Sequence, residues 1–175
     1  GAGHALQQIT VVLARPGDTQ HLAAVLQALR RHGLDLHLRV EPVDHVLHRL
    51  GHAAAVEVAI GADLCAIEEA EEFLRDVPEK QPFMATSCCP AWSVMAKKEF
   101  PGFAPYISMT MTPMVLTARL QKQKDPNCRV AFIGPCAAKK LEANRKSVRS
   151  DVDFVLTFEE LLGMFDAKEI DFKTL

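Results

Sequence analysis

The chain of 175 residues is long enough for one domain, or one lobe of a larger domain, with a real hydrophobic core. Its net charge of −2 leaves no basic surplus, which argues against a nucleic-acid-binding protein. No apolar run approaches a membrane span, and the first residues lack the pattern of an export signal. The 5 cysteines are odd in number and unevenly spaced, unlike a disulfide framework. We therefore expect a cytoplasmic protein with reduced thiols and no nucleic-acid or membrane partner.

The N-terminal third predicts alternating strands and helices after a short tail at 1–8. Short apolar runs predict buried strands over 9–14 and 54–59. Between them, the pattern predicts a helix ending near His32, a strand over 34–40 and a helix over 43–50. Residues 9–175 are interpreted as a single unit without internal repeats.

All 7 histidines lie between His4 and His52. His48 and His52 have the spacing that places two metal ligands on one helical face, but Gly51 between them predicts that the helix has already ended. The histidines are therefore interpreted as solvent-facing polar residues.

A glutamate-rich helix is predicted over 64–77, with Asp63 as its N-cap. Its apolar, inward face is predicted to be Leu64, Ile67, Ala70 and Leu74. Glu69 and Glu72 are three residues apart and so share a face. A face rich in carboxylates is usually only solvated, so this spacing alone assigns no function.

Residues 86–92, Thr-Ser-Cys-Cys-Pro-Ala-Trp, are the most informative stretch. The apolar run 82–85 predicts a strand before it, and 92–100 predict a helix whose first turn suits Pro90. Cys88 and Cys89 are thereby placed at a helix N-terminus, where unpaired amides and the helix dipole stabilise a thiolate. Because thiolates bind iron or zinc and attack electrophiles, the two cysteines are a candidate site.

A second junction of this kind occurs at 134–136, Gly-Pro-Cys, between a predicted strand at 129–133 and a helix at 137–143. In parallel α/β sheets, ligands bind beyond the carboxyl ends of the strands. Cys89 and Cys136 are therefore predicted to lie on one edge of the sheet. Each cysteine alone would be explained as a small buried residue, but two equivalent junctions favour a site.

The remaining elements complete an α/β pattern. Thr112 and Pro113 open a helix, and 154–156 form a strand before a helix over 158–167 that has a capping box. Strands that alternate with helices across short loops predict a parallel twisted sheet with helices on both faces.

Residues 86–92 and the motif Pro-Cys-x-x-Lys-Lys-x-Glu at 135–142 resemble the first two signature motifs of the iron-only ([FeFe]) hydrogenase large subunit. Segments 61–64, 68–70 and 151–161 also resemble this family, over about Val56 to Phe172. The resemblance implies one lobe of a two-lobed catalytic domain. The family's third, Gly- and Cys-rich motif belongs to the second lobe and does not occur before Leu175.

The resemblance also implies roles for particular residues. Cys89 and Cys136 would ligate a [4Fe–4S] cluster, which is joined in the complete enzyme to a diiron subcluster with CO and CN⁻ ligands. The implied proton-transfer residues are Cys88, Glu69, Glu72 and Ser108. The implied cofactor-binding residues are Lys139, Pro135 and Pro113. The implied reaction is reversible proton reduction to H₂ in an anaerobic setting, with a ferredoxin-like electron carrier as partner.

A cubane cluster normally needs four thiolates, and the resemblance supplies two. We therefore expect the chain alone to bind no cofactor and to be inactive until a second lobe or complementary subunit joins it. Gly134 replaces the methionine that commonly precedes Pro-Cys in the family. This departure is compatible with a sensory, hydrogenase-like protein that does not turn over H₂.

Three other functions are compatible with part of the pattern. An iron–sulfur assembly or scaffold protein would share the cluster cysteines, but it would need none of Cys88, Glu69, Glu72 and Lys139. A hydrolase or phosphatase with Cys88 as nucleophile would need an arginine five or six residues later, which is absent, and no histidine is near in sequence. A non-catalytic α/β remnant is the third.

Overall fold

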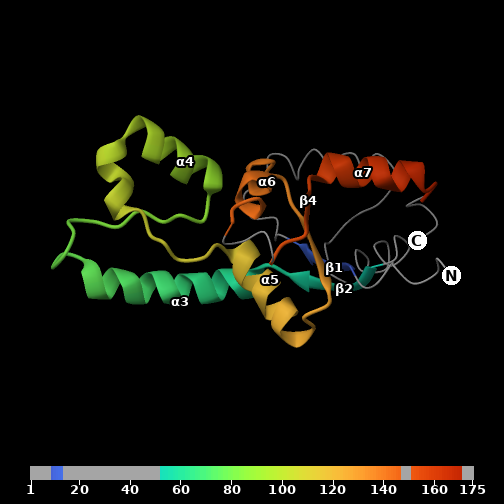
Figure 1. The fold of residues 1–175 in the computed structure, drawn as a ribbon, viewed down its shortest axis with the longest axis horizontal. Coiled ribbons are helices and arrows are strands. Elements are labelled where there is room, and N and C mark those ends of the chain that lie inside the picture. Colours follow the sequence, from blue (N-terminus) through green and yellow to red (C-terminus); the bar gives the residue numbers. More distant parts are fainter. Residues whose placement is uncertain (1–8, 14–51, 147–150, 171–175) are drawn as a thin grey trace, which may run out of the picture.

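The computed structural model describes residues 9–13, 52–146 and 151–170 (Figure 1). The helices and the strand predicted between 19 and 50 lie outside the described residues. Within the described ranges, four strands form one sheet in the order β2-β1-β3-β4. The strands are β1 (Ile9–Leu13), β2 (His52–Glu57), β3 (Arg129–Ile133) and β4 (Phe154–Leu156).

Every pairing in this sheet is parallel. β1 lies between β2 and β3, so that Val12 is in register with Val56 on one side and with Phe132 on the other. β3 also pairs with β4. The carboxyl ends of all four described strands therefore meet at one edge, as the predicted parallel sheet requires.

Helices cover both sides of the sheet. The described helices are α3 (Ala59–Asp76), α4 (Pro90–Glu99), the 3-10 helix η1 (Pro101–Tyr106), α5 (Pro113–Lys124), α6 (Ala138–Ala143) and α7 (Phe158–Ala167). α5 packs on β1, β3 and α3, while α6 packs on β4 and α4. In Figure 1, α6 and α7 lie above the strands and α5 lies below them. The predicted α/β class is confirmed.

Local signals in the sequence account for several helix starts. Pro90 and Pro113 occupy the first positions of α4 and α5, where the missing N–H of proline costs no hydrogen bond. Thr157 accepts a bond from the N–H of Glu160 at 3.3 Å, and Glu160 accepts one from the N–H of Thr157 at 2.9 Å. This reciprocal capping box starts α7, as predicted.

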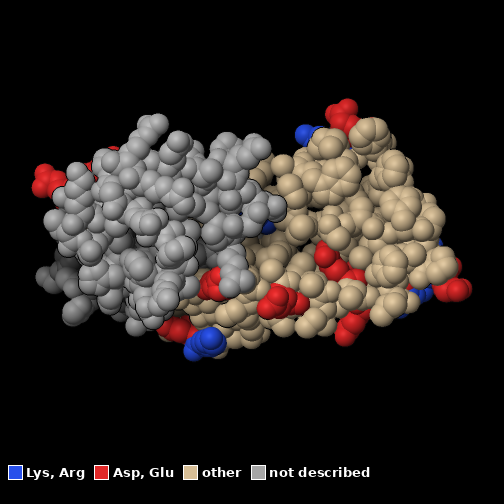
Figure 2. All heavy atoms as spheres, turned by 180° about the vertical axis from the view of Figure 1, so that it is seen from behind, with Lys and Arg blue, Asp and Glu red and all other residues tan. Residues whose placement is uncertain are grey.

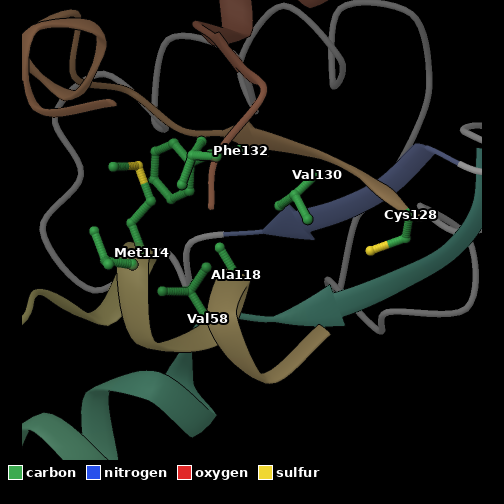
Figure 3. Packing of buried hydrophobic residues seen from close by; sticks show 8 residues of the cluster. Val58, Met114, Ala118, Cys128, Val130 and Phe132 are labelled. Carbon is green, nitrogen blue, oxygen red and sulfur yellow. The ribbon is translucent and has the colours of Figure 1, made fainter. Parts of the chain in front are cut away.

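A hydrophobic cluster fills the space between α5 and the sheet (Figure 3). Its buried members are Val58, Met114, Val115, Ala118, Cys128, Val130, Phe132 and Val152. Cys128 therefore serves as a small apolar core residue.

The carboxylate of Asp153 ties α5 and β3 to the segment before β4. It accepts hydrogen bonds from Lys122 Nζ at 2.8 Å, Arg129 Nη1 at 2.6 Å and the backbone N–H of Val130 at 2.8 Å. Burial alone would raise the pKa of Asp153, but these donors outweigh it and lower the pKa.

Helix α3 differs from its prediction in its start and in its buried face. It begins at Ala59, so Asp63 lies inside the helix and does not cap it. The residues predicted to face inward, Leu64, Ile67, Ala70 and Leu74, are exposed. Gly61 and Cys65 are buried instead. A Cβ at Gly61 would clash with Thr117 Oγ1 and the Pro113 carbonyl, so the small residues let α3 approach α5 closely.

The strand predicted over 82–85 is also wrong. Only Ala85 forms a bridge, with Ile107, outside the main sheet. Its N–H donates to the Tyr106 carbonyl and its carbonyl accepts from the Ser108 N–H, both at 2.8 Å. The run begins with Pro82, and a second proline lies at 78; a proline N cannot donate to a ladder. Cys88 and Cys89 therefore follow a single bridge rather than a sheet strand.

Candidate functional site

The first cysteine turn is held by hydrogen bonds at both ends. Cys89 is the N-cap of α4, and its Sγ accepts a bond from the N–H of Trp92 at 3.5 Å. The Trp92 indole Nε1 donates to the Thr86 carbonyl at 3.1 Å. Cys88 and Cys89 are free thiols with exposed side chains. Both thiols are therefore available to a ligand at a helix N-terminus, as predicted.

The second cysteine turn follows β3. The N–H of Gly134 donates to the Leu156 carbonyl at 3.1 Å, which ties this turn to the end of β4. Cys136 is a half-buried free thiol, and its carbonyl accepts from the N–H of Lys139 at 3.1 Å. Pro135, which precedes it, is half-buried. Cys136 thus lies at the carboxyl edge of the sheet, where parallel α/β folds bind ligands.

Lys139 joins the two turns. Its Nζ donates to the Cys88 carbonyl at 3.0 Å and to Glu142 Oε2 at 2.7 Å. The side chains of Lys139 and Glu142 are 13% and 3% exposed, so this ion pair is largely removed from water. A lysine near a helix start is disfavoured by the dipole. Glu142 and the Cys88 carbonyl offset that cost and fix the ammonium beside the first turn.

Glu72 meets the loop that follows η1. Its Oε2 accepts hydrogen bonds from Ser108 Oγ at 2.5 Å and from Thr110 Oγ1 at 3.1 Å. Ser108 was predicted to work with Glu72, and the structure brings the two together. Thr110 is a site residue that sequence reasoning missed, because no family motif or helical spacing marks it.

Glu69 lies on the same side of α3, in a less polar environment. Burial raises its pKa above the ordinary value of 4.5, although the backbone N–H of Ser87 donates to its carboxylate and lowers the pKa. The nearby charge of Glu72 raises the pKa further. Glu69 Oε1 is buried and has no hydrogen-bond partner among the described residues.

The chain segments on either side of the Ala85–Ile107 bridge cover these glutamates. One segment supplies Ser87 to Glu69, and the other supplies Ser108 and Thr110 to Glu72. Ser87 Oγ donates to the Thr110 carbonyl at 3.3 Å and so links the two segments. A candidate relay, Glu69 and Glu72, is thereby covered by the loop that leads into the first cysteine turn.

Cys65 is a further residue of this region that sequence reasoning did not single out. Burial raises its pKa to about 11, and the charges of Glu69 and Cys88 act in the same direction. Cys65 lies one helical turn before Glu69, and this spacing of four residues is the signal that marks it in the sequence. The raised pKa keeps it a thiol at neutral pH, unlike a typical metal ligand.

Pro113 has a structural place in the fold. It is the first residue of α5, and its carbonyl accepts a hydrogen bond from Thr117 Oγ1 at 2.8 Å. The same carbonyl lies against Gly61 of α3. The cofactor contacts predicted for Pro113 and Pro135 stay predictions.

The described residues contain no group of three or more His, Cys, Asp or Glu side chains arranged to hold a metal ion. The two turns carry three free thiols, and the two that the motifs predict as ligands, Cys89 and Cys136, would make half of a cubane's usual set. None of the helices in the described part is long and apolar enough to cross a membrane. Figure 2 shows acidic side chains along the side where α3 lies, where Glu68 and Glu71 are exposed. This flank is a solvated helix face.

A parallel sheet with Cys136 at its carboxyl edge, and with Cys88 and Cys89 at a neighbouring turn joined to it by Lys139, defines an α/β fold with free thiols at two turns. The sequence model of the iron only hydrogenase large subunit, C-terminal domain, matches residues 22–175. The chain therefore belongs to the iron-only hydrogenase large-subunit family, as the signature motifs predicted.

Hydrogenases and an assembly factor are among its curated relatives. Iron hydrogenase 1 of Clostridium pasteurianum is 30% identical over 74% of this chain and 25% of its own length. The periplasmic [Fe] hydrogenase large subunit of Nitratidesulfovibrio vulgaris is 32% identical over 74% of this chain and 34% of its own length. The cytosolic Fe-S cluster assembly factor NAR1 of Kluyveromyces lactis is 38% identical over 56% of this chain and 21% of its own length.

A solved structure has the same fold over nearly the whole chain. The apo [FeFe]-hydrogenase of Chlamydomonas reinhardtii, in a single-site variant, superposes with a TM-score of 0.78 at 26% identity. The match covers 99% of this chain and 46% of that one. This chain therefore spans less than half the length of the hydrogenases it matches.

Proposed function

We propose that the chain forms the first lobe of an [FeFe]-hydrogenase catalytic unit, which reversibly reduces protons to H₂. The observation that carries the proposal is the hydrogen-bonded pair Ser108–Glu72, beside the half-buried Glu69, whose carboxylate accepts from the Ser87 N–H next to the first cysteine turn. A protein that only binds a cluster has no use for paired carboxylates and hydroxyls covered by that turn. The remaining ligands would come from a second lobe or a complementary subunit, and a ferredoxin-like carrier would supply the electrons.

Cys89 and Cys136 would hold the [4Fe–4S] part of the H-cluster in this unit. The fit is supported by the donor set, because both residues are free thiols at turns on the ligand-binding side of the fold. The Lys139 ammonium, fixed between the Cys88 carbonyl and Glu142, would offset the negative charge of a thiolate-bound group. When bound, the H-cluster supplies the electrons and the iron at which protons are reduced.

Protons would move through Cys88, Glu69, Ser108 and Glu72. The raised pKa of Glu69, caused mainly by burial, makes this carboxyl group hold a proton more readily than an ordinary glutamate. Its unpartnered Oε1 is the atom at which such a proton would be held. Ser108 already donates its hydroxyl hydrogen to Glu72, so it can pass that hydrogen to Oε2 while its own oxygen accepts another.

The test is to produce the chain with a complementary second lobe under anaerobic maturation and to compare two adjacent variants. Cys88→Ala is expected to keep the iron but to lose on the order of 10²- to 10⁴-fold in H₂ evolution, the usual contribution of an acid–base group. Cys89→Ala is expected to lose the iron itself. Near wild-type turnover by Cys88→Ala, with normal iron content, would reject the proposed proton path.

A function in iron–sulfur cluster assembly is the second candidate. It is favoured by the 38% identity to the assembly factor NAR1 of Kluyveromyces lactis. The reconstituted complex separates the two. H₂ evolution with reduced methyl viologen supports the enzyme, whereas cluster transfer to an apo-ferredoxin without H₂ evolution supports the assembly factor.

A further inference from the structure

Glu72 carries two hydroxyl donors on the same carboxylate oxygen. Ser108 Oγ and Thr110 Oγ1 lie 2.5 Å and 3.1 Å from Oε2. A carboxylate oxygen has room for two such donors, because each oxygen offers two lone pairs. Thr110 is two residues beyond Ser108 on an irregular segment, so the pair arises from the fold of this loop.

The backbone of Thr110 orients Ser108 as well. The Thr110 N–H donates to Ser108 Oγ at 3.1 Å, so this oxygen is already an acceptor on one side. The only hydrogen of the Ser108 hydroxyl is then directed at Glu72. The Thr110 backbone therefore sets the direction in which the Ser108 hydroxyl donates. The Thr110 hydroxyl donates to the same oxygen of Glu72.

Thr110 is also linked to the other glutamate. Its carbonyl accepts a bond from Ser87 Oγ at 3.3 Å, and the N–H of Ser87 donates to the carboxylate of Glu69. A continuous set of hydrogen bonds thus runs from Glu69 through Ser87 and Thr110 to Glu72. It passes directly beside Cys88, the residue after Ser87.

We propose that Thr110 is a positioning residue for Glu72, holding Oε2 where Ser108 donates to it. With one donor, the carboxylate can turn about its last bond and offer either oxygen. Two donors on one oxygen fix which atom faces Ser108, and hydrogen bonds to a charged acceptor are among the stronger ones. This inference rests on the proposed function and adds a residue to its proton path.

The test reads the Glu72 carboxyl group directly in the full chain. Glutamate side chains are labelled with ¹³C at the carboxyl carbon, and the Glu72 signal is assigned by its loss in Glu72→Gln. Thr110→Val keeps the shape but removes the hydroxyl, and it is expected to shift the Glu72 signal. Thr110→Ser restores a hydroxyl and is expected to return the signal toward its original position.

Thr112→Val is the matched control. Thr112 Oγ1 is buried in the same segment, with no hydrogen-bond partner among the described residues. Removing this hydroxyl changes composition in the same way as Thr110→Val, and it is expected to leave the Glu72 signal in place. An unmoved signal in Thr110→Val, or an equal shift in Thr112→Val, overturns the proposal.

A second measurement uses the unaltered chain, so it remains possible if the Thr110→Val variant does not fold. The bond to Glu72 predicts a slowly exchanging Thr110 hydroxyl proton with a nuclear Overhauser contact to the Glu72 side chain. Absence of that contact overturns the proposal. Because these signals are read without any cluster, failure here rejects the role of Thr110 alone, whereas the proposed function fails by its own H₂ assay.

Discussion

At the scale of single residues, the ion pair between Lys139 and Glu142 is the most deeply buried charge pair described at the site. Both partners are largely desolvated, and the lysine also binds the carbonyl of Cys88. Taking two charges out of water is costly, so such a pair is retained where the position of a charge matters. Here the pair holds the Lys139 ammonium at the first cysteine turn.

Glu142→Gln is expected to lower the free energy of unfolding by about 3 kcal/mol, because it leaves the Lys139 ammonium buried without a counter-charge. Urea denaturation followed by circular dichroism measures the change. Arg75→Gln is the matched control, since it removes the solvent-screened pair with Asp76 and should cost much less stability. Equal losses of unfolding free energy in the two variants would show that burial of the Lys139–Glu142 pair does not increase its effect on stability.

Glu69 should make the stability of the chain depend on pH in an unusual direction. Its pKa in the folded state lies above the ordinary value of 4.5, mainly because of burial, so the folded chain binds this proton more tightly than the unfolded chain. The stability that Glu69 contributes is therefore fully present below about pH 4.5 and is lost as pH rises through the folded-state pKa.

Glu69→Gln keeps an acceptor for the N–H of Ser87 but does not titrate. We expect its free energy of unfolding, relative to the unaltered chain, to be higher at pH 7.5 than at pH 4. Denaturant titrations at the two pH values give this difference. A difference that stays constant, or that shrinks as pH rises, would contradict the burial of Glu69.

At the scale of elements, the crossing of α3 and α5 depends on Gly61. Gly61→Ala should destabilise the fold by about 1–3 kcal/mol, because the new methyl group meets the Thr117 hydroxyl and the Pro113 carbonyl. Gly163→Ala in α7 is the control, since a Cβ there meets nothing within 4 Å. It should stabilise by up to about 1 kcal/mol through helix propensity. Thermal melts that rank the two variants the other way would refute this packing.

Elements with local start signals were predictable from sequence. α4 and α5 begin at prolines and α7 at a capping box, and such signals act within one turn of the helix. The start of α3 was predicted wrongly because Asp63 was taken as the N-cap, whereas the helix already begins at Ala59 and Gly61 lies within it. Gly61 is the point of closest approach to another helix, which is a tertiary requirement that periodicity does not encode.

The candidate site was predictable only where a motif or a helical spacing marked it. The cysteine turns and Lys139 follow from motifs, and the shared face of Glu69 and Glu72 follows from helical geometry. The sequence did not predict that this face of α3 would be covered, because the loops that cover it have no periodic pattern. Thr110 was missed for the same reason, and the contact of Ser87 with Glu69 was not predicted although Ser87 lies within the motif at 86–92.

At the scale of the whole molecule, the chain spans less than half of its solved relative, and only two of its cysteines, Cys89 and Cys136, are proposed as cluster ligands. Anaerobic reconstitution with iron and sulfide is therefore expected to give no stable cubane on the monomer, because two thiolates leave half of the iron coordination unfilled. Iron and sulfide analysis after gel filtration measures this. A stoichiometric cluster on the monomer would show that other residues of the chain complete the ligand set.

The central place of β1 has a consequence for how the protein is made. One neighbour of β1 is β3, whose residues are synthesised about 120 positions later. At the usual pace of ~5–20 residues per second, that edge of β1 waits roughly 6–24 s for its partner to leave the ribosome. An apolar strand of sequence Ile-Thr-Val-Val-Leu with an open edge invites pairing with other chains during this time. Production of the protein should therefore depend on chaperones that shield nascent chains, and slower synthesis should favour aggregation over folding.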